Sequence, residues 1–317
     1  MESGSADAVM GGVVALGECM VELSLSGSRQ AAIGYAGDVF NTCVYLQRLG
    51  ASACFATAVG DGDPFSAAIL ALMAAEGVGD GLVTRVPGRV PGLYAIERDA
   101  AGERRFFYWR DQAPVRQFFD LADVTAFRDA ALSADLVYVS GITLAVIGEA
   151  GRAALGAILA EACAAGVPVA FDPNYRPRLW PSHEVALAAT QAVIGWCRIV
   201  SASGPDVEAL CERPLGEVAA TWAARGPQVL ARFEDGAIEL HAADAVRRLP
   251  AGPQVKAVDT TGAGDSFNAG FLAGWLKGLS AEQATAVGRR LASHVVGHVG
   301  AITPAADFPP PGSLFEA

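Results

Sequence analysis

A carboxylate placed just inside a predicted helix, behind two glycines, is the first feature of the sequence that could do chemistry. The stretch 255–271 reads VKAVDTTGAGDSFNAGF and carries Gly262, Gly264 and Asp265 between an apolar, strand-like run and a helix. The first N–H groups of a helix have no intrahelical acceptor and lie at the positive end of its dipole. Glycines let a phosphate approach those groups closely. The junction therefore predicts an anion hole with Asp265 at its mouth.

Asp265 has two interpretations at this point. One is a simple helix cap, which a lone G-x-G-D favours. The other is a general base, because a hydroxyl that attacks a phosphoryl group needs a carboxylate to take its proton. No G-K-S/T follows, and the six-residue spacing of a dinucleotide fingerprint is absent. Without a lysine, the hole must work with backbone dipoles, a metal and a base.

These residues need a scaffold that brings the ends of several strands together. Short apolar runs alternate with longer amphipathic segments, which is the pattern of a parallel sheet covered by helices on both faces. The expected strands are Gly12–Leu16, Ala53–Val59, Leu136–Val139, Val167–Phe171, Ile199–Ser201, Val229–Phe233 and Val255–Val258. The expected helices are Val39–Leu49, Phe65–Glu76, Arg152–Ala165, Glu184–Cys197 and one from Ser266 onward. Ligands of such folds gather at the carboxyl ends of the strands, so polar residues there carry extra weight.

The segment Gly92–Arg110 breaks this pattern and predicts two strands around a D-A-A-G-E turn. Large side chains alternate along its second strand, with Phe106, Tyr108 and Arg110 on one face and Phe107 and Trp109 on the other. A small accessory sheet, with one face on a ligand and the other on a partner subunit, would use both faces. An ordinary hairpin packed on the domain is the other interpretation. The Pro-rich end of the chain is expected to be a surface tail.

Composition and charge narrow the classes of function. The 317 residues are 52% hydrophobic and 18% charged, which is enough for a large core. The net charge of -11 disfavours a nucleic-acid or anionic-membrane surface, although a local positive pocket for a small anion stays compatible with it. The six cysteines form no C-x-x-C pair, so we expect reduced thiols in a cytoplasmic protein. No apolar run approaches the ~20 residues needed to cross a bilayer, and the first nine residues lack signal-peptide features.

The stretch D-T-T-G-A-G-D-S-F resembles the C-terminal signature of the ribokinase-like (PfkB) carbohydrate kinases, and the likeness runs from about Val13 to Pro304. It implies a three-layer α/β/α fold with a mostly parallel sheet and a small β-sheet lid. It implies a single domain over residues 10–305, with lid strands near 22–36 and 92–111 and tails at 1–9 and 306–317. In that family the final aspartate, here Asp265, is the catalytic base. The anion hole is then the backbone of Gly262, Ala263, Gly264 and Asp265.

Further stretches are similar to one branch of that family, the 2-keto-3-deoxygluconate kinases: G-E-C-M-V-E-L-S (17–24), P-G-L-Y-A-I-E (91–97), E-R-R-F-F-Y-W-R (103–110) and D-P-N-Y-R-P-R-L-W (172–180). The implied reaction moves the γ-phosphoryl group of ATP to the C6 hydroxyl of that sugar acid. A sugar acid needs a cation in its pocket, and the planar guanidinium of Arg110 or Arg176 suits a carboxylate. A surface ion pair is the alternative role for each arginine.

The resemblance also implies the other ligand-binding residues. The substrate residues are Gly37, Asp38 and Asn41 from G-Y-A-G-D-V-F-N, with Tyr94, Tyr108, Arg110, Arg176 and Asp265. The nucleotide residues are Asn174, Arg176, Ser203, Arg232, Gly236, Gly262 and Gly264. Glu208 is expected to reach Mg²⁺ through water, and a monovalent cation is expected near Asp259. The implied partners are a sugar acid and ATP in a homo-oligomer whose β lid is a candidate dimer interface, with no nucleic acid and no membrane.

Two segments depart from the family pattern. The usual nucleotide-side V-K-x-G appears as V-L-A-R-F-E-D-G-A, with Arg232 near the lysine position and the glycine delayed to Gly236. The N-x-x-E element reads P-D-V-E, so Pro205 stands where Asn is common while Glu208 is retained. Two other functions stay open beside the sugar-acid kinase. They are a same-fold kinase for a neutral sugar, of the fructokinase or ribokinase type, and a non-catalytic sugar-binding protein.

Overall fold

The computed structural model of the chain describes residues 11–25, 30–98, 104–253 and 255–316. Its centre is a nine-stranded sheet in the order β13-β12-β11-β10-β9-β8-β1-β4-β5. The strands are β1 (Val13–Leu16), β4 (Ala53–Asp61), β5 (Val83–Pro87), β8 (Leu136–Ser140), β9 (Val169–Asp172), β10 (Ile199–Ser203), β11 (Gln228–Arg232), β12 (Ile238–Ala242) and β13 (Ala245–Leu249). From β11 to β5 all neighbours are parallel, while β12 and β13 pair antiparallel. Six of the seven apolar runs predicted as strands are strands of this sheet, and Val255–Val258 is the exception.

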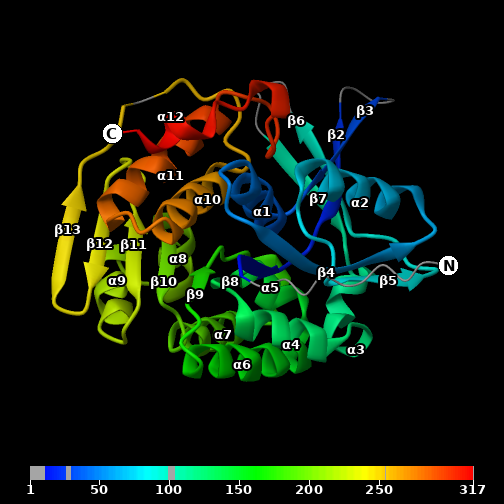
Figure 1. Cartoon of the computed structure of the whole chain (residues 1–317), viewed down its shortest axis with the longest axis horizontal. Helices are drawn as coiled ribbons and strands as arrows, with labels where there is room; N and C mark the ends of the chain where they lie inside the picture. Colours follow the sequence, from blue (N-terminus) through cyan, green and yellow to red (C-terminus); the bar gives the residue numbers. More distant parts are fainter. Residues whose placement is uncertain (1–10, 26–29, 99–103, 254, 317) are drawn as a thin grey trace.

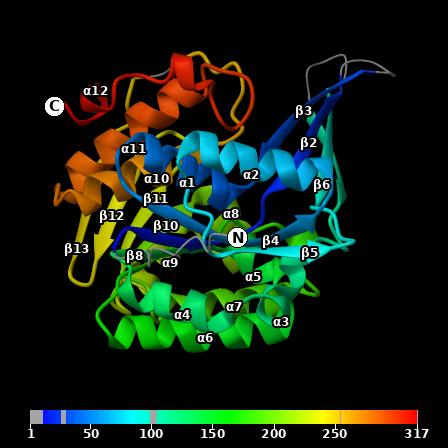
Figure 2. The ribbon, with the colours of Figure 1, turned by 45° about the vertical axis from the view of Figure 1, so that its right-hand side comes forward.

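Helices cover both faces of this sheet (Figures 1 and 2). One face carries α1 (Asp38–Arg48), α2 (Pro64–Glu76), α10 (Ala263–Leu276) and α11 (Ala281–Val295). The other carries α3 (Phe118–Leu121), α4 (Val124–Ser133), α5 (Gly141–Val146), α6 (Gly148–Ala164), α7 (His183–Ile194), α8 (Gly204–Cys211) and α9 (Leu215–Ala223). The strands of this sheet are buried on both faces, so the sequences of β1 and β8 are almost entirely apolar. The predicted three-layer α/β/α class is confirmed.

A second, four-stranded sheet rises from one end of the molecule, at the upper right of Figure 1. Its order is β3-β2-β6-β7, built from β2 (Met20–Leu25), β3 (Ala31–Ala36), β6 (Leu93–Arg98) and β7 (Arg104–Trp109). The predicted hairpin is therefore present as β6 and β7, while its D-A-A-G-E turn lies outside the described residues. The predicted alternation holds, because the Phe106 and Tyr108 rings stack at 6.4 Å and Trp109, on the opposite face, is 62% exposed.

The chain leading into α10 is not the strand that the sequence predicted. Val255 and Val258 are about half exposed, and the amides of Val258 and Asp259 donate to the carbonyl of Val296, at the end of α11. These residues therefore pair with a helix end and join no sheet. The edge strands β12 and β13 were missed because β13 (AVRRL) is almost entirely exposed and shows no apolar run.

The Pro-rich end of the chain packs on the surface of the domain. A 3-10 turn, η3 (Ala305–Asp307), and the short helix α12 (Pro311–Phe315) fold back over α11. Leu314 is buried, and its carbonyl accepts a hydrogen bond of 2.8 Å from Nε of Arg290. Two more 3-10 turns, η1 (Pro114–Gln117) and η2 (Pro177–Leu179), connect elements elsewhere in the chain.

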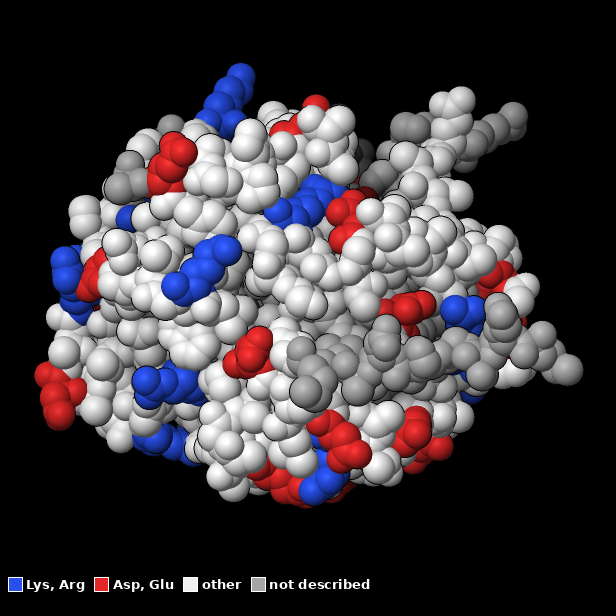
Figure 3. Space-filling model, viewed as in Figure 1, with Lys and Arg blue, Asp and Glu red and all other residues white. Residues whose placement is uncertain are grey.

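The strand order places the ligand site. Strands β4 and β5 lie on one side of β1, and strands β8 to β13 lie on its other side. The strand order therefore reverses between β1 and β8. In open α/β sheets a crevice forms at such a point, beyond the carboxyl ends of the strands. On the face shown in Figure 3, Lys and Arg lie scattered among Asp and Glu and form no broad basic patch. None of the helices in the described ranges is long and apolar enough to cross a membrane.

Candidate active site

The glycine-rich turn before α10 has the geometry of an anion hole. Gly262 caps the helix with φ of +76°, and a Cβ there would lie 2.6 Å from the carbonyl oxygen of Ala301, so only glycine fits. The first intrahelical bond runs from the Ser266 amide to the Gly262 carbonyl at 2.8 Å. The amides of Gly264 and Asp265 precede that bond and stand at the positive end of the helix dipole.

Asp265 lies where the N-termini of α10 and α1 meet. Its Oδ2 accepts a hydrogen bond of 2.7 Å from Nδ2 of Asn41, whose Oδ1 accepts from the Gly37 amide at 3.3 Å. Gly262 occupies the N-cap position and Asp265 lies within the first turn of α10, so Asp265 is not the N-cap residue. A Cβ on Gly37 would lie 1.9 Å from the carbonyl oxygen of Glu18, so this glycine lets the two segments touch. The structure thus joins the predicted residues Gly37, Asn41 and Asp265.

The surroundings of Asp265 change its acidity. Desolvation between α1 and α10, followed by the negative charges of Asp38 and Asp172, raises the pKa of Asp265 to about 8. The hydrogen bond from Asn41 and, to a smaller extent, the positive charge of Arg176 lower the pKa, but desolvation and the Asp38 charge have the larger effects. A carboxylate with a pKa near working pH is a better proton acceptor than an ordinary aspartate.

This pKa predicts the pH dependence of catalysis. A general base works only when deprotonated, so kcat/KM should rise with pH and level off above about pH 8. Asp38→Asn removes the Asp38 charge and so lowers the pKa of Asp265. The rising limb of the plot of kcat/KM against pH should therefore move to lower pH, even though turnover itself falls. Steady-state assays over a pH range measure the position of the limb. An Asp38→Asn limb that coincides with the wild-type limb would contradict the assignment.

A second hydrogen-bonded chain links Asp38 to the end of β9. Nδ2 of Asn174 donates to Asp38 at 2.9 Å, and the Asn174 amide donates to Asp172 at 3.0 Å. Asp172 also accepts from Nδ2 of Asn268, on α10, at 2.6 Å. Burial raises the pKa of Asp172, and the positive charge of Arg232 opposes this effect. Asp172 was not predicted, although it directly follows an expected strand and so carried the positional signal.

Arg232 supplies a cation to the anion hole. It ends β11, lies 5.2 Å from the Phe267 ring on α10, and donates to Asp172 at 3.4 Å. Its Nη1 is 3.4 Å from the position that a Cβ of Gly264 would take. Its buried Nε has no hydrogen-bond partner among the described residues. The hole therefore has a guanidinium beside Gly264.

Arg176 reaches the edge of the same group of carboxylates. Its Nη1 donates to Asp206 at 2.7 Å, and its side chain is 50% exposed. Arg176 therefore makes a surface ion pair, which was the alternative to a ligand-binding role. Its charge is still close enough to lower the pKa of Asp265. An exposed ion pair contributes little to stability, so a ligand can replace Asp206 at low cost.

The other residues predicted for the nucleotide and cations lie around Arg232 or further along the chain. Ser203 pairs with Arg232 across β10 and β11. Gly236 turns the β11–β12 loop with φ of +81°. Glu208 accepts a hydrogen bond of 3.0 Å from the Leu215 amide at the start of α9, so its metal role stays a prediction. Asp259 accepts from the Thr261 amide at 2.9 Å and from the Gly300 amide at 3.2 Å.

The predicted substrate residues of the small sheet line one face, but two of them are already paired. Arg110 donates from Nη2 to buried Glu18, and the Tyr94 hydroxyl donates to buried Glu22. Tyr108 lies between them, with its ring 5.8 Å from that of Tyr94 and 5.9 Å from the Arg110 guanidinium. Sequence reasoning missed both glutamates, because their charges have a role only once the strands are paired.

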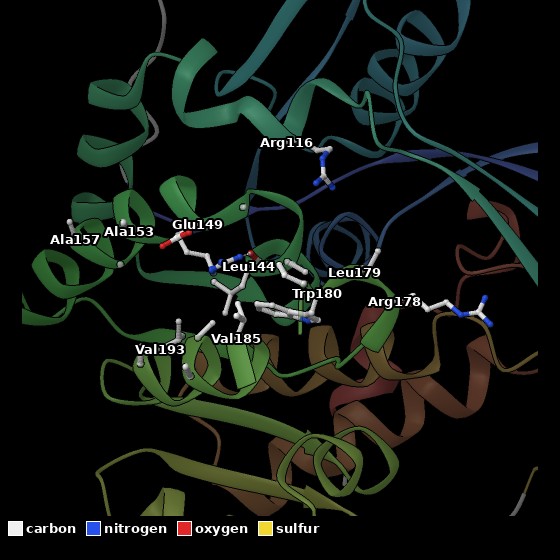
Figure 4. Close-up of a pocket in the computed structure, with 18 of the residues that line it drawn as sticks. Arg116, Leu144, Glu149, Ala153, Ala157, Arg178, Leu179, Trp180, Val185 and Val193 are labelled. Carbon is white, nitrogen blue, oxygen red and sulfur yellow. Dashed lines mark hydrogen bonds between the residues drawn. The ribbon is translucent and has the colours of Figure 1, made fainter. Parts of the chain in front are cut away.

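A large hollow lies away from Asp265 and the anion hole. A cavity of about 980 Å³ lies between α6 and α7. Figure 4 shows Leu144, Trp180 and Val185 close together in it, with Arg116 and Arg178 towards its margins. Exposed alanines of the two helices form much of its wall, and Asp265 does not line it. Arg110 lines one edge of this hollow, while the other residues predicted for the substrate and the anion hole lie outside it.

Comparison with known proteins agrees with this geometry. A family model described as "pfkB family carbohydrate kinase" matches residues 10–307. The chain is similar to a 2-dehydro-3-deoxygluconokinase of Dickeya dadantii, at 38% identity over 94% of this chain and 98% of the relative. A protein of the same name from Escherichia coli K12 is 37% identical over the same shares. The structure of a PfkB protein from Polaromonas superposes with a TM-score of 0.82 at 22% identity, covering 96% of this chain and 99% of that one. The chain belongs to the pfkB family of carbohydrate kinases.

Proposed function

We propose that this protein transfers the γ-phosphoryl group of ATP to the C6 hydroxyl of 2-keto-3-deoxygluconate, which is 2-dehydro-3-deoxygluconate under its other name. The observation that carries the proposal is the junction of α1 and α10, where Asp265 stands beside an open helix N-terminus. Two relatives at 37–38% identity are 2-dehydro-3-deoxygluconokinases, which supports a sugar acid as the acceptor.

In this proposal the residues divide the work as follows. Asp265 takes the proton of the C6 hydroxyl as the new O–P bond forms, which contributes roughly 10²–10⁴-fold to the rate. The amides of Gly264 and Asp265 receive the oxygens of the transferred group, and their fixed orientation needs no rearrangement during the reaction. Asp38 and Asn41 bind hydroxyl groups of the sugar. Arg110, at the end of β7, binds its carboxylate.

Mg²⁺ is the metal expected with ATP, and it neutralises charge on the phosphates when bound. Among the described residues, no three His, Cys, Asp or Glu side chains form a dedicated metal cage. This fits Mg²⁺, which is usually held by one or two carboxylates together with phosphates and water. Asp172 and Asp206, which flank Arg232 and Arg176, are the carboxylates placed to hold it, with Glu208 further along α8.

Arg232 gives this proposal a test on the nucleotide side. Its guanidinium beside Gly264 should contact the phosphates of ATP, and a charge-assisted hydrogen bond of this kind contributes about 1.5–3 kcal/mol. Arg232→Leu should therefore raise KM for ATP or lower kcat by about 10- to 150-fold while leaving KM for the sugar acid nearly unchanged. Arg225→Leu, at a surface arginine that donates to Gln191 on α7, is the control. Equal ATP kinetics in both variants would remove Arg232 from the phosphate site.

The proposed reaction is tested by an ATP-coupled assay over acidic and neutral sugars. The expected result is turnover of 2-keto-3-deoxygluconate with a kcat/KM well above those of fructose and ribose. Higher values for a neutral sugar would identify a fructokinase- or ribokinase-type enzyme. Sugar binding by calorimetry without binding of ATP–Mg²⁺ would identify a non-catalytic sugar-binding protein.

The small sheet, which we propose as a lid on the sugar, also has a candidate dimer face. Ile33, Phe107 and Trp109 expose 58%, 38% and 62% of their surface. We propose that two copies of the chain pair through these side chains, which sedimentation analysis would detect. We further propose a monovalent cation beside Asp259, checked by the dependence of kcat on K⁺, and a cytoplasmic location, checked by cell fractionation.

A further inference from the structure

The two glutamates of G-E-C-M-V-E-L-S have no part in the proposed transfer, yet both are buried. Glu18 is 4% exposed just before β2, and Glu22 is 9% exposed within it. Because burying an unpaired carboxylate costs several kcal/mol, each one needs a strong partner. In both cases that partner is a residue that the proposed function places against the substrate.

Glu18 holds the guanidinium of Arg110. Its Oε2 accepts from Nη2 of Arg110, and the two side chains are 3% and 6% exposed. The Nε of Arg110 has no partner among the described residues, and the guanidinium also lies over the half-exposed Tyr108 ring. A Cβ on Gly92 would come within 2.6 Å of Oε1 of Glu18, so the glycine leaves room for this pair. One edge of the guanidinium is thereby fixed, and the other remains for a ligand.

Glu22 holds the hydroxyl of Tyr94 in the same way. The two residues face each other across the parallel strands β2 and β6, and the hydroxyl donates to Oε2. Oε1 accepts a second hydrogen bond of 3.1 Å from Ser24. Burial and the charge of Glu22 raise the pKa of Tyr94, so the phenol keeps its proton. That proton is already donated, so the phenol oxygen can only accept from a ligand.

We propose that Glu18 and Glu22 are positioning residues that orient the sugar acid under the lid. Glu18 directs Arg110 to the carboxylate of the substrate, and Glu22 makes Tyr94 an acceptor for a sugar hydroxyl. The substrate then has one orientation, with its acid group at the end of β7 and a hydroxyl at β6. This inference rests on the proposed function. Because both glutamates act through another residue on the lid, their loss should affect binding of the sugar acid and leave the transfer step unchanged.

The test compares Glu18→Gln and Glu22→Gln with the matched control Glu97→Gln. Glu97 lies on β6 of the same sheet, 47% exposed and 3.5 Å from Arg105, so its substitution makes the same chemical change away from the pocket. We expect KM for 2-keto-3-deoxygluconate to rise about tenfold in each of the first two variants, with kcat and KM for ATP within about twofold of wild type. Glu97→Gln should match wild type. Unchanged KM in Glu18→Gln and Glu22→Gln would overturn the proposal.

Double variants decide whether each glutamate acts through its partner. Glu22→Gln should not raise KM for the sugar acid any further in a Tyr94→Phe background, and Glu18→Gln should not raise it further in an Arg110→Gln background. In each background the contact between the partner side chain and the substrate is already gone. Additive losses would overturn the positioning role. A lower KM in Glu18→Gln would also overturn it, because it would show that Glu18 competes with the substrate for Arg110.

Two controls separate this inference from folding and from the proposed function. Thermal unfolding shows which variants fold. If Glu18→Gln does not, Gly92→Ala presses on the same carboxylate and should raise KM for the sugar acid in its place. A wild-type protein that does not phosphorylate the sugar acid would refute the proposed function. If the wild-type protein phosphorylates the sugar acid and the KM of Glu18→Gln and Glu22→Gln is unchanged, only the positioning role is refuted.

Discussion

Replacing Asp265 with Asn is expected to lower kcat about 10³-fold or more while the protein folds and binds both ligands. The amide has nearly the shape of the carboxylate and keeps an oxygen for the hydrogen bond from Asn41, but it cannot take the proton of the attacking hydroxyl. The amides of Gly264 and residue 265 remain in place, so some catalysis over water should survive. The coupled assay measures kcat, and calorimetry measures binding of ATP and of the sugar acid.

The same variant has a stability signature. The pKa of Asp265 is about 8 in the folded chain against an ordinary value of 3.8. Between these two pH values the folded state holds a proton that the unfolded state has released. The free energy of unfolding therefore falls as pH rises from about 4 to about 8, because the buried carboxylate becomes harder to keep protonated. Asp265→Asn removes that penalty and should unfold at a higher temperature than wild type at pH 8, with a smaller difference near pH 4. Near-wild-type kcat would exclude Asp265 as the base, and a lower Tm at pH 8 would contradict its raised pKa.

The sequence was most informative where local chemistry is self-contained. The parallel strands were predictable because a strand buried on both faces must be apolar throughout, as in β1 and β8. The anion hole was predictable because its parts, Gly262, Gly264 and Asp265, are contiguous in the chain. The same logic failed at Val255–Val258, where an apolar run is half exposed and bonds to the end of α11.

Residues whose role depends on a distant partner were harder to find. Asp172 becomes part of the site only because Asn268 and Arg232 reach it from α10 and β11. Glu18 and Glu22 act through strands that lie about 70 to 90 positions further along the chain. Their common signal was a carboxylate directly after an apolar run or inside one. Such a residue costs free energy when buried, and only tertiary structure shows what offsets that cost.

Replacing Arg110 with Gln is expected to abolish the preference for sugar acids. A charge-assisted contact to a carboxylate contributes about 1.5–3 kcal/mol, so kcat/KM for 2-keto-3-deoxygluconate should fall about 10- to 150-fold. A neutral sugar makes no such contact, so its kcat/KM should change by less than about twofold. Gln is preferable to Ala here, because its amide can still donate to the buried carboxylate of Glu18, and an unpaired buried charge would cost about 3–5 kcal/mol of stability.

The matched control for this loss is Arg105→Gln on the same strand. Arg105 is 66% exposed and pairs with Glu97 at 3.5 Å, so its substitution removes an equal charge from β7 away from Asp265. If long-range attraction of the anionic substrate were responsible, the two variants would lose activity alike, and 0.5 M salt would reduce the wild-type rate to the same level. Direct contact predicts a loss in Arg110→Gln alone that persists at high salt. Equal losses on acidic and neutral sugars would show that Arg110 supports the lid and does not recognise the carboxylate.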